Sequence, residues 1–102
     1  MDYLSNELTI IIILFEEDDD LVLRSLNNIK NFRLIIIDNA NNKNLKKKIE
    51  QKFNIEKYLL NKTNIGFTKA ANQAIKLCKT EYILNLNADC FIEEKDIVLL
   101  IR

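Results

Sequence analysis

The sequence contains no histidine and only one glycine, Gly66, among its 102 residues. Without histidine, the Ser-His and Cys-His catalytic arrangements and every metal site that uses imidazole are excluded. With one glycine, neither the GxGxxG fingerprint nor the P-loop can be present. Any ligand must therefore be bound without a glycine-rich phosphate loop and without imidazole.

Charge and cysteine content narrow the possibilities further. The 15 Lys and Arg residues balance 15 Asp and Glu residues, so the formal net charge is zero and we expect no nucleic-acid partner. The two cysteines, Cys78 and Cys90, match neither a CxxC motif nor a zinc-site spacing, which favours free thiols.

Long hydrophobic runs are also absent. The longest, Leu8 to Phe15, is far shorter than the roughly 18 residues that a membrane-spanning helix needs. The acidic start of the chain lacks the basic region of a signal peptide. We therefore expect a cytoplasmic protein without a transmembrane segment, and a chain of this length can form one domain with one core.

The hydrophobic pattern predicts alternating strands and helices. Continuous β-branched runs indicate buried strands at residues 9–15 and 33–38, and shorter apolar runs indicate strands at 56–60 and 81–86. Helical spacing of apolar residues predicts helices after the first three strands, and a further helix that starts at residue 93. The acidic residues 18–20 suit the start of the first helix. In the third helix, Thr68 is the expected cap, and the predicted buried face is Phe67, Ala71, Ala74, Ile75 and Cys78.

Strands that alternate with helices predict an α/β fold with three layers, α/β/α, around a mainly parallel sheet of about four strands. Because crossovers between parallel strands are right-handed, the carboxyl ends of all strands meet at one edge of the sheet. Open α/β sheets bind ligands at that edge. The polar and aromatic residues expected there are Phe15, Glu16, Asp38, Asn61, Asn87 and Asp89.

Four segments between Thr9 and about Ile92 carry a resemblance to a known family. They are TIIIILFE from residue 9, IIIDNANN from 35, NIGFTKAANQAI from 64 and LNLNADC from 84. In this order and spacing, they resemble the N-terminal, nucleotide-binding half of family 2 glycosyltransferases of the GT-A fold, in particular the rhamnosyltransferase-like branch. The resemblance implies a Rossmann-like half-fold with strand order 3-2-1-4. It also implies transfer of a sugar, with inversion, from a UDP- or dTDP-sugar to a saccharide or lipid-linked acceptor.

The resemblance also implies roles for individual residues. Phe15 would lie near the nucleoside, and Asp38 would accept a hydrogen bond from the pyrimidine ring. Asn64 and Gly66 would shape the loop against the nucleoside, with the glycine permitting close approach of the backbone. Asn87 would complete the nucleotide-binding set.

Asp89 stands where the family has the acid that binds Mg²⁺ or Mn²⁺ and, through the metal, the diphosphate. Two departures weaken the match, since Asn87 replaces an acid in that motif and Glu16 would repel a diphosphate. The catalytic base and the acceptor-binding half are expected later in a full-length member. Residues 1–102 therefore look like one donor-binding subdomain, truncated before that half and inactive on its own.

Two alternatives from other classes stay open. A receiver domain of two-component signalling has a similar parallel sheet and acidic residues after its first strand. Such a domain needs an Asp after the third strand, where this chain has Asn61. The other alternative is a non-catalytic α/β interaction module, with a possible homodimer through an exposed sheet edge.

Overall fold

The computed structural model describes residues 6–93, which form a four-stranded parallel sheet with three helices. The strand order is β3-β2-β1-β4, as the resemblance implies. The predicted helix beyond Glu93 lies outside the described residues. The elements are β1 (Leu8–Leu14), α2 (Asp19–Asn27), β2 (Arg33–Asp38), α3 (Lys43–Lys52), β3 (Lys57–Leu60), α4 (Phe67–Leu77) and β4 (Tyr82–Leu86).

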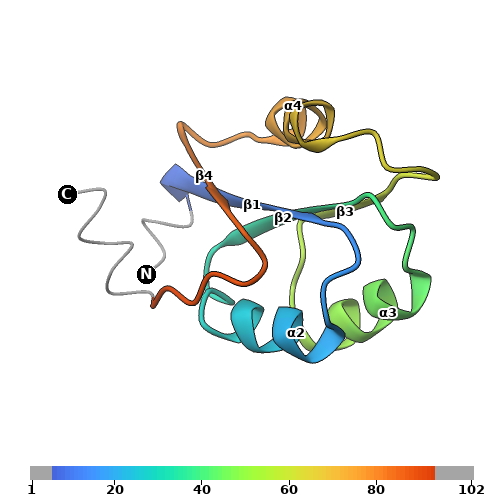
Figure 1. The fold of residues 1–102 in the computed structure, drawn as a ribbon. Helices are drawn as coiled ribbons and strands as arrows, with labels where there is room; N and C mark the ends of the chain where they lie inside the picture. Colours follow the sequence, from blue (N-terminus) through green and yellow to red (C-terminus); the bar gives the residue numbers. More distant parts are fainter. Residues whose placement is uncertain (1–5, 94–102) are drawn as a thin grey trace.

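Helices cover both faces of the sheet, so the molecule has the three predicted layers. Of the three described helices, α4 lies on one face, and α2 and α3 lie on the other (Figure 1). Side chains of a strand alternate between the two faces, which divides the core into two clusters. Ile10 and Ile12 pack in the cluster that includes residues of α2 and α3, whereas Ile11 packs with Ala70 and Ala74 of α4.

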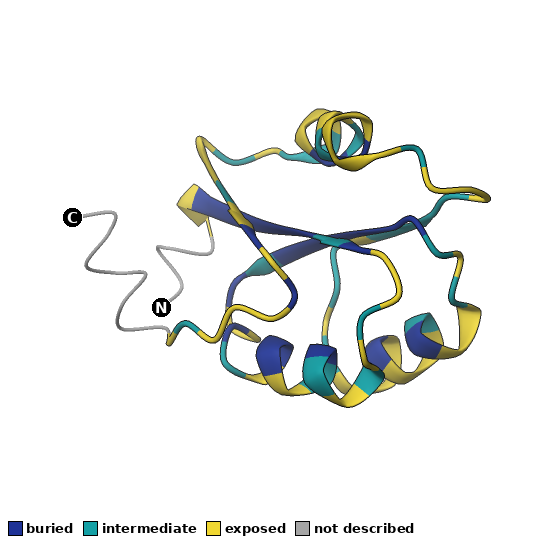
Figure 2. Cartoon of the chain, viewed as in Figure 1, coloured by how far each residue is buried: buried dark blue, intermediate teal, exposed yellow. Residues whose placement is uncertain are grey.

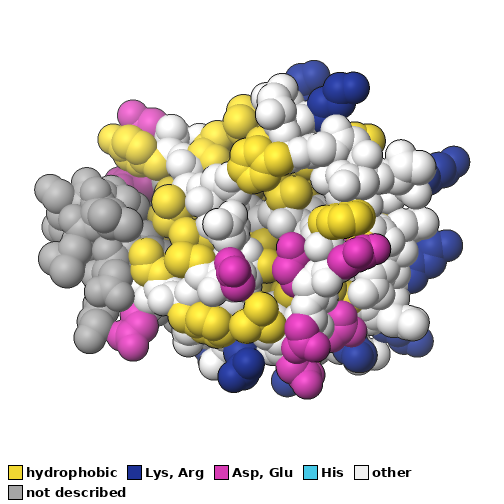
Figure 3. All heavy atoms as spheres, viewed as in Figure 1, with side chains coloured by type: hydrophobic (Ala, Val, Ile, Leu, Met, Phe, Trp, Pro, Cys, Tyr) yellow, Lys and Arg dark blue, Asp and Glu magenta, His cyan; other side chains and the backbone are white. Residues whose placement is uncertain are grey.

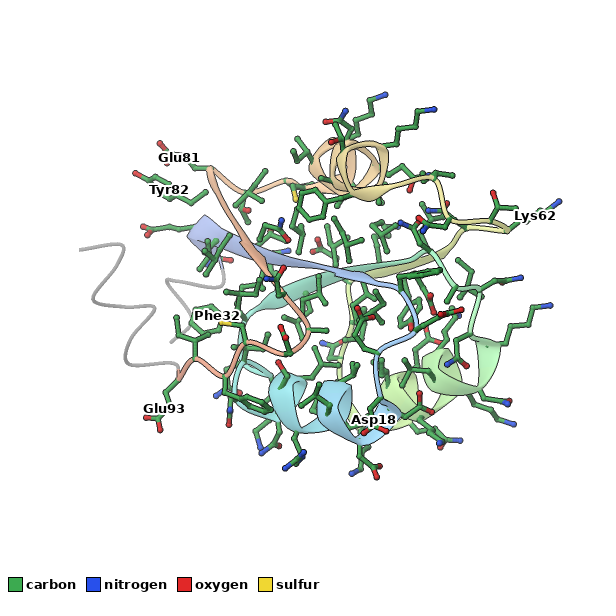
Figure 4. The ribbon with its side chains drawn as sticks, in the orientation of Figure 1. Asp18, Phe32, Lys62, Glu81, Tyr82 and Glu93 are labelled. Atoms are coloured by element: carbon green, nitrogen blue, oxygen red, sulfur yellow. The ribbon has the colours of Figure 1, made fainter. Side chains whose placement is uncertain are left out.

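The two central strands form the most buried part of the protein (Figure 2). Strands β1 and β2 pair in parallel from Thr9 opposite Arg33 to Leu14 opposite Asp38. The continuous apolar runs of the two strands fit this position, because a central parallel strand is covered on both sides. Strand β4 forms one edge of the sheet, and Tyr82 at its start points outward with 49% of its surface exposed (Figure 4).

The starts of α2 and α3 follow the usual capping chemistry. The Asp18 carboxylate accepts a hydrogen bond of 3.1 Å from the backbone N–H of Leu21, and the Asn42 side chain accepts one of 3.0 Å from Leu45. The acidic cluster therefore begins α2 as predicted. No helix in residues 6–93 is long and apolar enough to cross a membrane.

Helix α4 differs from the prediction in two respects. Its N-cap residue is Gly66, and no side chain caps it, so the predicted capping role of Thr68 was wrong. Its buried residues are Ala70 and Ala74, whereas Phe67 and Ile75 are about half exposed. The small side chains of the two alanines face the sheet, which suits a helix packed close to it, and the bulky residues flank that contact.

The packing of α4 can be tested at adjacent positions. Ala74→Leu should destabilise the fold by about 1–3 kcal/mol, because the larger side chain would overpack the space above β1 and β2. Ile75→Ala, at a position 47% exposed, should cost less than about 1 kcal/mol. Urea unfolding of both variants measures the difference, and equal losses would contradict this packing.

Candidate functional site

A hollow of about 270 Å³ opens at the carboxyl edge of the sheet, between the ends of β1 and β4 and the loop before α4. This volume is near the lower end of the range for small-molecule sites, roughly 300–1,000 Å³. Four of the predicted site residues, Phe15, Asn64, Gly66 and Asn87, line it. The described lining residues are Ile13, Phe15, Glu17, Asn39, Asn64, Gly66, Phe67, Asn85, Leu86 and Asn87.

Strand alternation explains most of this lining. Ile11 faces α4, so Ile13 and Phe15, at two-residue intervals, continue on the same face. On β4, Asn85 pairs with Ile11, and Asn87 follows two residues later. The hollow is therefore the α4 face of the carboxyl edge, where α4 leaves the ends of β1 and β4 uncovered.

Asp38 lies on the opposite face of the sheet from this hollow. It follows Leu34 and Ile36 at two-residue spacing on β2 and therefore shares their face, which packs against α2 and α3. Asp38 is only 1% exposed. Its carboxylate accepts hydrogen bonds from the backbone N–H groups of Ala40, at 2.8 Å, and Asn42, at 3.2 Å. The structure thus does not bring Asp38 together with the other predicted nucleotide-binding residues, and Asp38 instead holds the turn after β2.

Asn39, the first residue after β2, lines the hollow, and the sequence analysis missed it. Asn39 follows Ile35 and Ile37 at two-residue spacing, and both of these pack against α4. The two-residue spacing could have identified Asn39 from the sequence. Successive side chains along a strand point to opposite faces, so Asp38 and Asn39 are expected on different faces of the sheet.

Tyr58 of β3 lies near the Asp38 carboxylate. Burial, followed by the negative charge of Asp38, raises the pKa of the Tyr58 hydroxyl well above its usual range. The hydroxyl makes no hydrogen bond of acceptable geometry among the described residues. Tyr58 therefore stays neutral at ordinary pH and supplies no charge beside Asp38.

Side-chain amides connect the ends of β2 and β3 to the start of α4. The Nδ2 of Asn39 donates to the carbonyl oxygen of Gly66 at 3.3 Å, and its Oδ1 accepts from Asn61 Nδ2 at 2.9 Å. Asn61 and Gln73 exchange two hydrogen bonds of 2.9 and 3.0 Å. The network fixes the loop that forms one wall of the hollow, and its members Asn39 and Gln73 were not predicted.

Gly66 has a backbone conformation that other residues avoid. Its φ is 88° and its ψ is 165°, a region almost restricted to glycine. Its N–H donates to the Asn64 side chain at 2.9 Å. A Cβ at this position would meet no atom within 4 Å, so within this chain the dihedral angles, and not crowding, require glycine.

Asp89 lies in a tight turn after β4 and is exposed, but it does not line the hollow. The N–H of Cys90 donates to the carbonyl oxygen of Asn87 at 3.0 Å, and the Ser25 hydroxyl donates to that of Cys90 at 3.2 Å. Ala88 is buried in the core, which leaves Asp89 facing outward. The buried side chain of Ala88 before Asp89 and the two hydrogen bonds of Cys90 after it therefore hold this turn in place.

The described residues contain no group of three or more His, Cys, Asp or Glu side chains that could hold a metal ion. Asp89 offers carboxylate oxygens of the kind that Mg²⁺ and Mn²⁺ prefer, but these ions need about six ligands. Most ligands would have to come from water and from a bound diphosphate. The acid that lines the hollow is Glu17, whose carboxylate accepts a hydrogen bond from the Phe15 N–H; Glu16 is exposed outside it.

The parallel sheet and the hollow at its carboxyl edge define a Rossmann-like α/β unit. The profile of Glycosyl transferase family 2 matches residues 9–102, and the chain therefore belongs to this family. Family membership decides against the receiver-like alternative. No curated protein sequence matches the chain.

The fold is similar to that in the crystal structure of S. aureus TarS, residues 1–349. The TM-score is 0.72 at 22% sequence identity, and the match covers 93% of this chain and 32% of the TarS chain. At this identity the likeness shows the fold alone. The chain thus spans about one third of the length of that structure.

The conformation of Gly66 gives a direct test of the loop geometry. Gly66→Ala should destabilise the protein by about 1–3 kcal/mol, because alanine would be strained at φ 88° although space is available. Urea unfolding measures the loss. A loss below about 0.5 kcal/mol, as is usual for surface substitutions, would contradict the described backbone.

Proposed function

We propose that the chain is the donor-binding half of a glycosyltransferase. It would bind a UDP- or dTDP-sugar, and the complete enzyme would transfer the sugar with inversion to a saccharide or lipid-linked acceptor. The observation that carries the proposal is the hollow, where Phe15, Asn64, Gly66 and Asn87 come together from three separate segments. Family membership supports glycosyl transfer in general.

In this proposal the hollow holds the nucleoside. The half-exposed ring of Phe15 offers a face for stacking the base. Asn64 and Asn87 are exposed in the hollow and offer amide groups that can donate and accept hydrogen bonds, which suits the edge of a pyrimidine. Asp38 acts indirectly, because its carboxylate holds the turn that presents Asn39.

The diphosphate would extend from the hollow past Asn87 toward Asp89. Asp89 would hold a divalent cation, Mg²⁺ or Mn²⁺, together with oxygens of the diphosphate. When bound, such a cation neutralises the charge that develops on the leaving diphosphate. Glu17 lines the same hollow and would repel an unscreened diphosphate, which makes binding depend more strongly on the cation.

The acceptor site and the catalytic base would lie in the part of a full-length enzyme that this chain does not include, since the chain covers 32% of the TarS structure. We therefore propose that residues 1–102 form one subdomain that binds the donor without transferring the sugar. A cytoplasmic location stays a prediction.

Calorimetric titration with UDP and dTDP tests the proposal. We expect binding in the presence of Mn²⁺ and weaker binding without it. Asp89→Asn should lower the affinity in Mn²⁺ by roughly 10-fold to 100-fold, which corresponds to the loss of one interaction with a charged group. Because Asp89 is exposed, its substitution should leave stability unchanged.

Glu81→Gln is the matched control, since it removes the same charge from an exposed position at the opposite end of β4. It should leave nucleotide affinity unchanged. Failure of a folded chain to bind either nucleotide would refute donor binding. Equal affinity of the Asp89→Asn variant and the parent chain would refute only the assigned cation ligand.

One observation favours a second function, that of an interaction module. In the sheet formed by residues 6–93, β4 is an edge strand without proline or charge, and Tyr82 and Ile83 are exposed along it. Hydrophobic side chains gather on the face over β4 and toward α4 (Figure 3). Natural proteins protect such edges or use them for pairing. A homodimer in which two β4 strands pair would cover this edge.

Sedimentation equilibrium tests the homodimer. If the edge pairs, the chain should be dimeric at micromolar concentration, and Ile83→Lys should make it monomeric because the charge would be buried in the interface. Thr63→Lys, at an exposed loop position, should leave the dimer intact. A monomeric parent chain, or a dimer that tolerates Ile83→Lys, would contradict pairing through β4.

A further inference from the structure

A second and larger hollow, of about 680 Å³, lies at the C-terminal ends of α2 and α3. None of its described lining residues belongs to the hollow at the carboxyl edge, which is called the donor hollow from here on. Helix α2 starts close to Glu17 of the donor hollow and then rises for nine residues at about 1.5 Å each. The two hollows therefore lie toward opposite ends of this helix. The second is lined by Leu23, Arg24, Asn27, Asn28, Lys30, Lys52, Phe53 and Phe91.

Among the described residues of this lining, every charged side chain is positive. They are Arg24, Lys30 and Lys52, in a chain whose net charge is zero. Within residues 6–93, none of these three bases forms an ion pair, whereas Lys46 and Lys48 pair with acids. The hollow, called the basic hollow below, is thus a local site of positive potential that no acid among the described lining residues neutralises.

Helix dipoles explain part of this arrangement. Arg24 and Lys52 lie in the last turns of α2 and α3, where a positive charge stabilises a helix. Lys30 lies beyond the end of α2, so the same explanation does not apply to it. The dipoles also leave the apolar part of the lining unexplained.

That apolar part is aromatic and accessible. Phe91 is 52% exposed, and the Arg24 guanidinium lies 6.0 Å from the centre of its ring. Leu23 and Phe53 are partly buried beside it and continue the apolar surface. A ligand that fits this lining therefore carries a negative charge next to an apolar group.

We propose that this hollow binds the headgroup of an anionic phospholipid at a membrane surface. The phosphate would lie among Arg24, Lys30 and Lys52, and the Phe91 ring would lie at the boundary between headgroups and acyl chains. Basic side chains next to an exposed aromatic ring are the usual means by which a protein lies on such a surface. A lipid fits better than free phosphate, because free phosphate has no apolar part to cover Phe91 and Phe53.

The distribution of charge along α2 would orient the protein on the membrane. Asp18 lies at the start of α2 (Figure 4), and Asp19 and Asp20 follow in its first turn, so an anionic surface repels this end. The far end of α2 lies at the basic hollow. The donor hollow would consequently face the aqueous phase and stay open to a water-soluble ligand. This arrangement does not depend on what the donor hollow binds.

Co-sedimentation of the full chain with vesicles tests the proposal. Vesicles of phosphatidylcholine with phosphatidylglycerol should bind the chain, and vesicles of phosphatidylcholine alone should not. The triple variant Arg24→Gln, Lys30→Gln, Lys52→Gln should lower the partition coefficient roughly 100-fold, since each base near an anionic surface contributes about fivefold. Phe91→Ala should lower it by a smaller factor, with all charges retained.

The matched control is the triple variant Lys47→Gln, Lys62→Gln, Lys76→Gln, which removes the same charge from exposed positions outside the hollow. It should retain most of the binding, and circular dichroism should show both triple variants folded. Equal losses in the two variants would mean non-specific attraction and would overturn the proposal. The absence of vesicle binding would also overturn the proposal. So would a result in which millimolar inorganic phosphate displaces the chain from the vesicles while chloride of equal ionic strength does not.

Discussion

The parallel pairing of β1 with β2, buried on both faces, is the constraint on which the rest of the structure depends. Ile10, Ile11, Ile35 and Ile36 are each at most 2% exposed, and burial of such a side chain contributes about 1.5–3 kcal/mol. The pairing fixes which side chains face α4 and which face α2 and α3. A shift by one residue would exchange the two sets, so the same burial that stabilises the sheet also determines which residues line the donor hollow.

The loop before α4 is the second determinant of that hollow. Gly66 adopts dihedral angles that favour glycine, and Asn39 and Asn61 hold the loop against the ends of β2 and β3. Amide groups that are hydrogen-bonded to one another in this way rigidify a polar region. The wall of the hollow is therefore formed before any ligand arrives, which reduces the cost of ordering the loop on binding.

The sequence was sufficient to predict the elements, the parallel sheet and the edge at which the hollow lies. Continuous β-branched runs and helical spacing are strong signals, and the four motifs supplied the strand order. The position of Asp38 at the strand end could be predicted, but its place on the face of α2 and α3 follows only from strand alternation. The buried face of α4 was misjudged because hydrophobicity alone favoured Phe67 and Ile75, whereas the short distance to the sheet selects alanine. The amide network joins residues far apart in the chain, and no local pattern indicates it.

Chemical-shift mapping by NMR during titration with UDP and Mg²⁺ tests the central claim most directly. The account predicts that the largest shifts occur at the backbone amides of Phe15, Asn39, Gly66 and Asn87, and that those of Arg24 and Lys52 change little. Shifts concentrated at the basic hollow, or an unchanged spectrum from a folded chain at millimolar UDP, would contradict the assignment of the donor site.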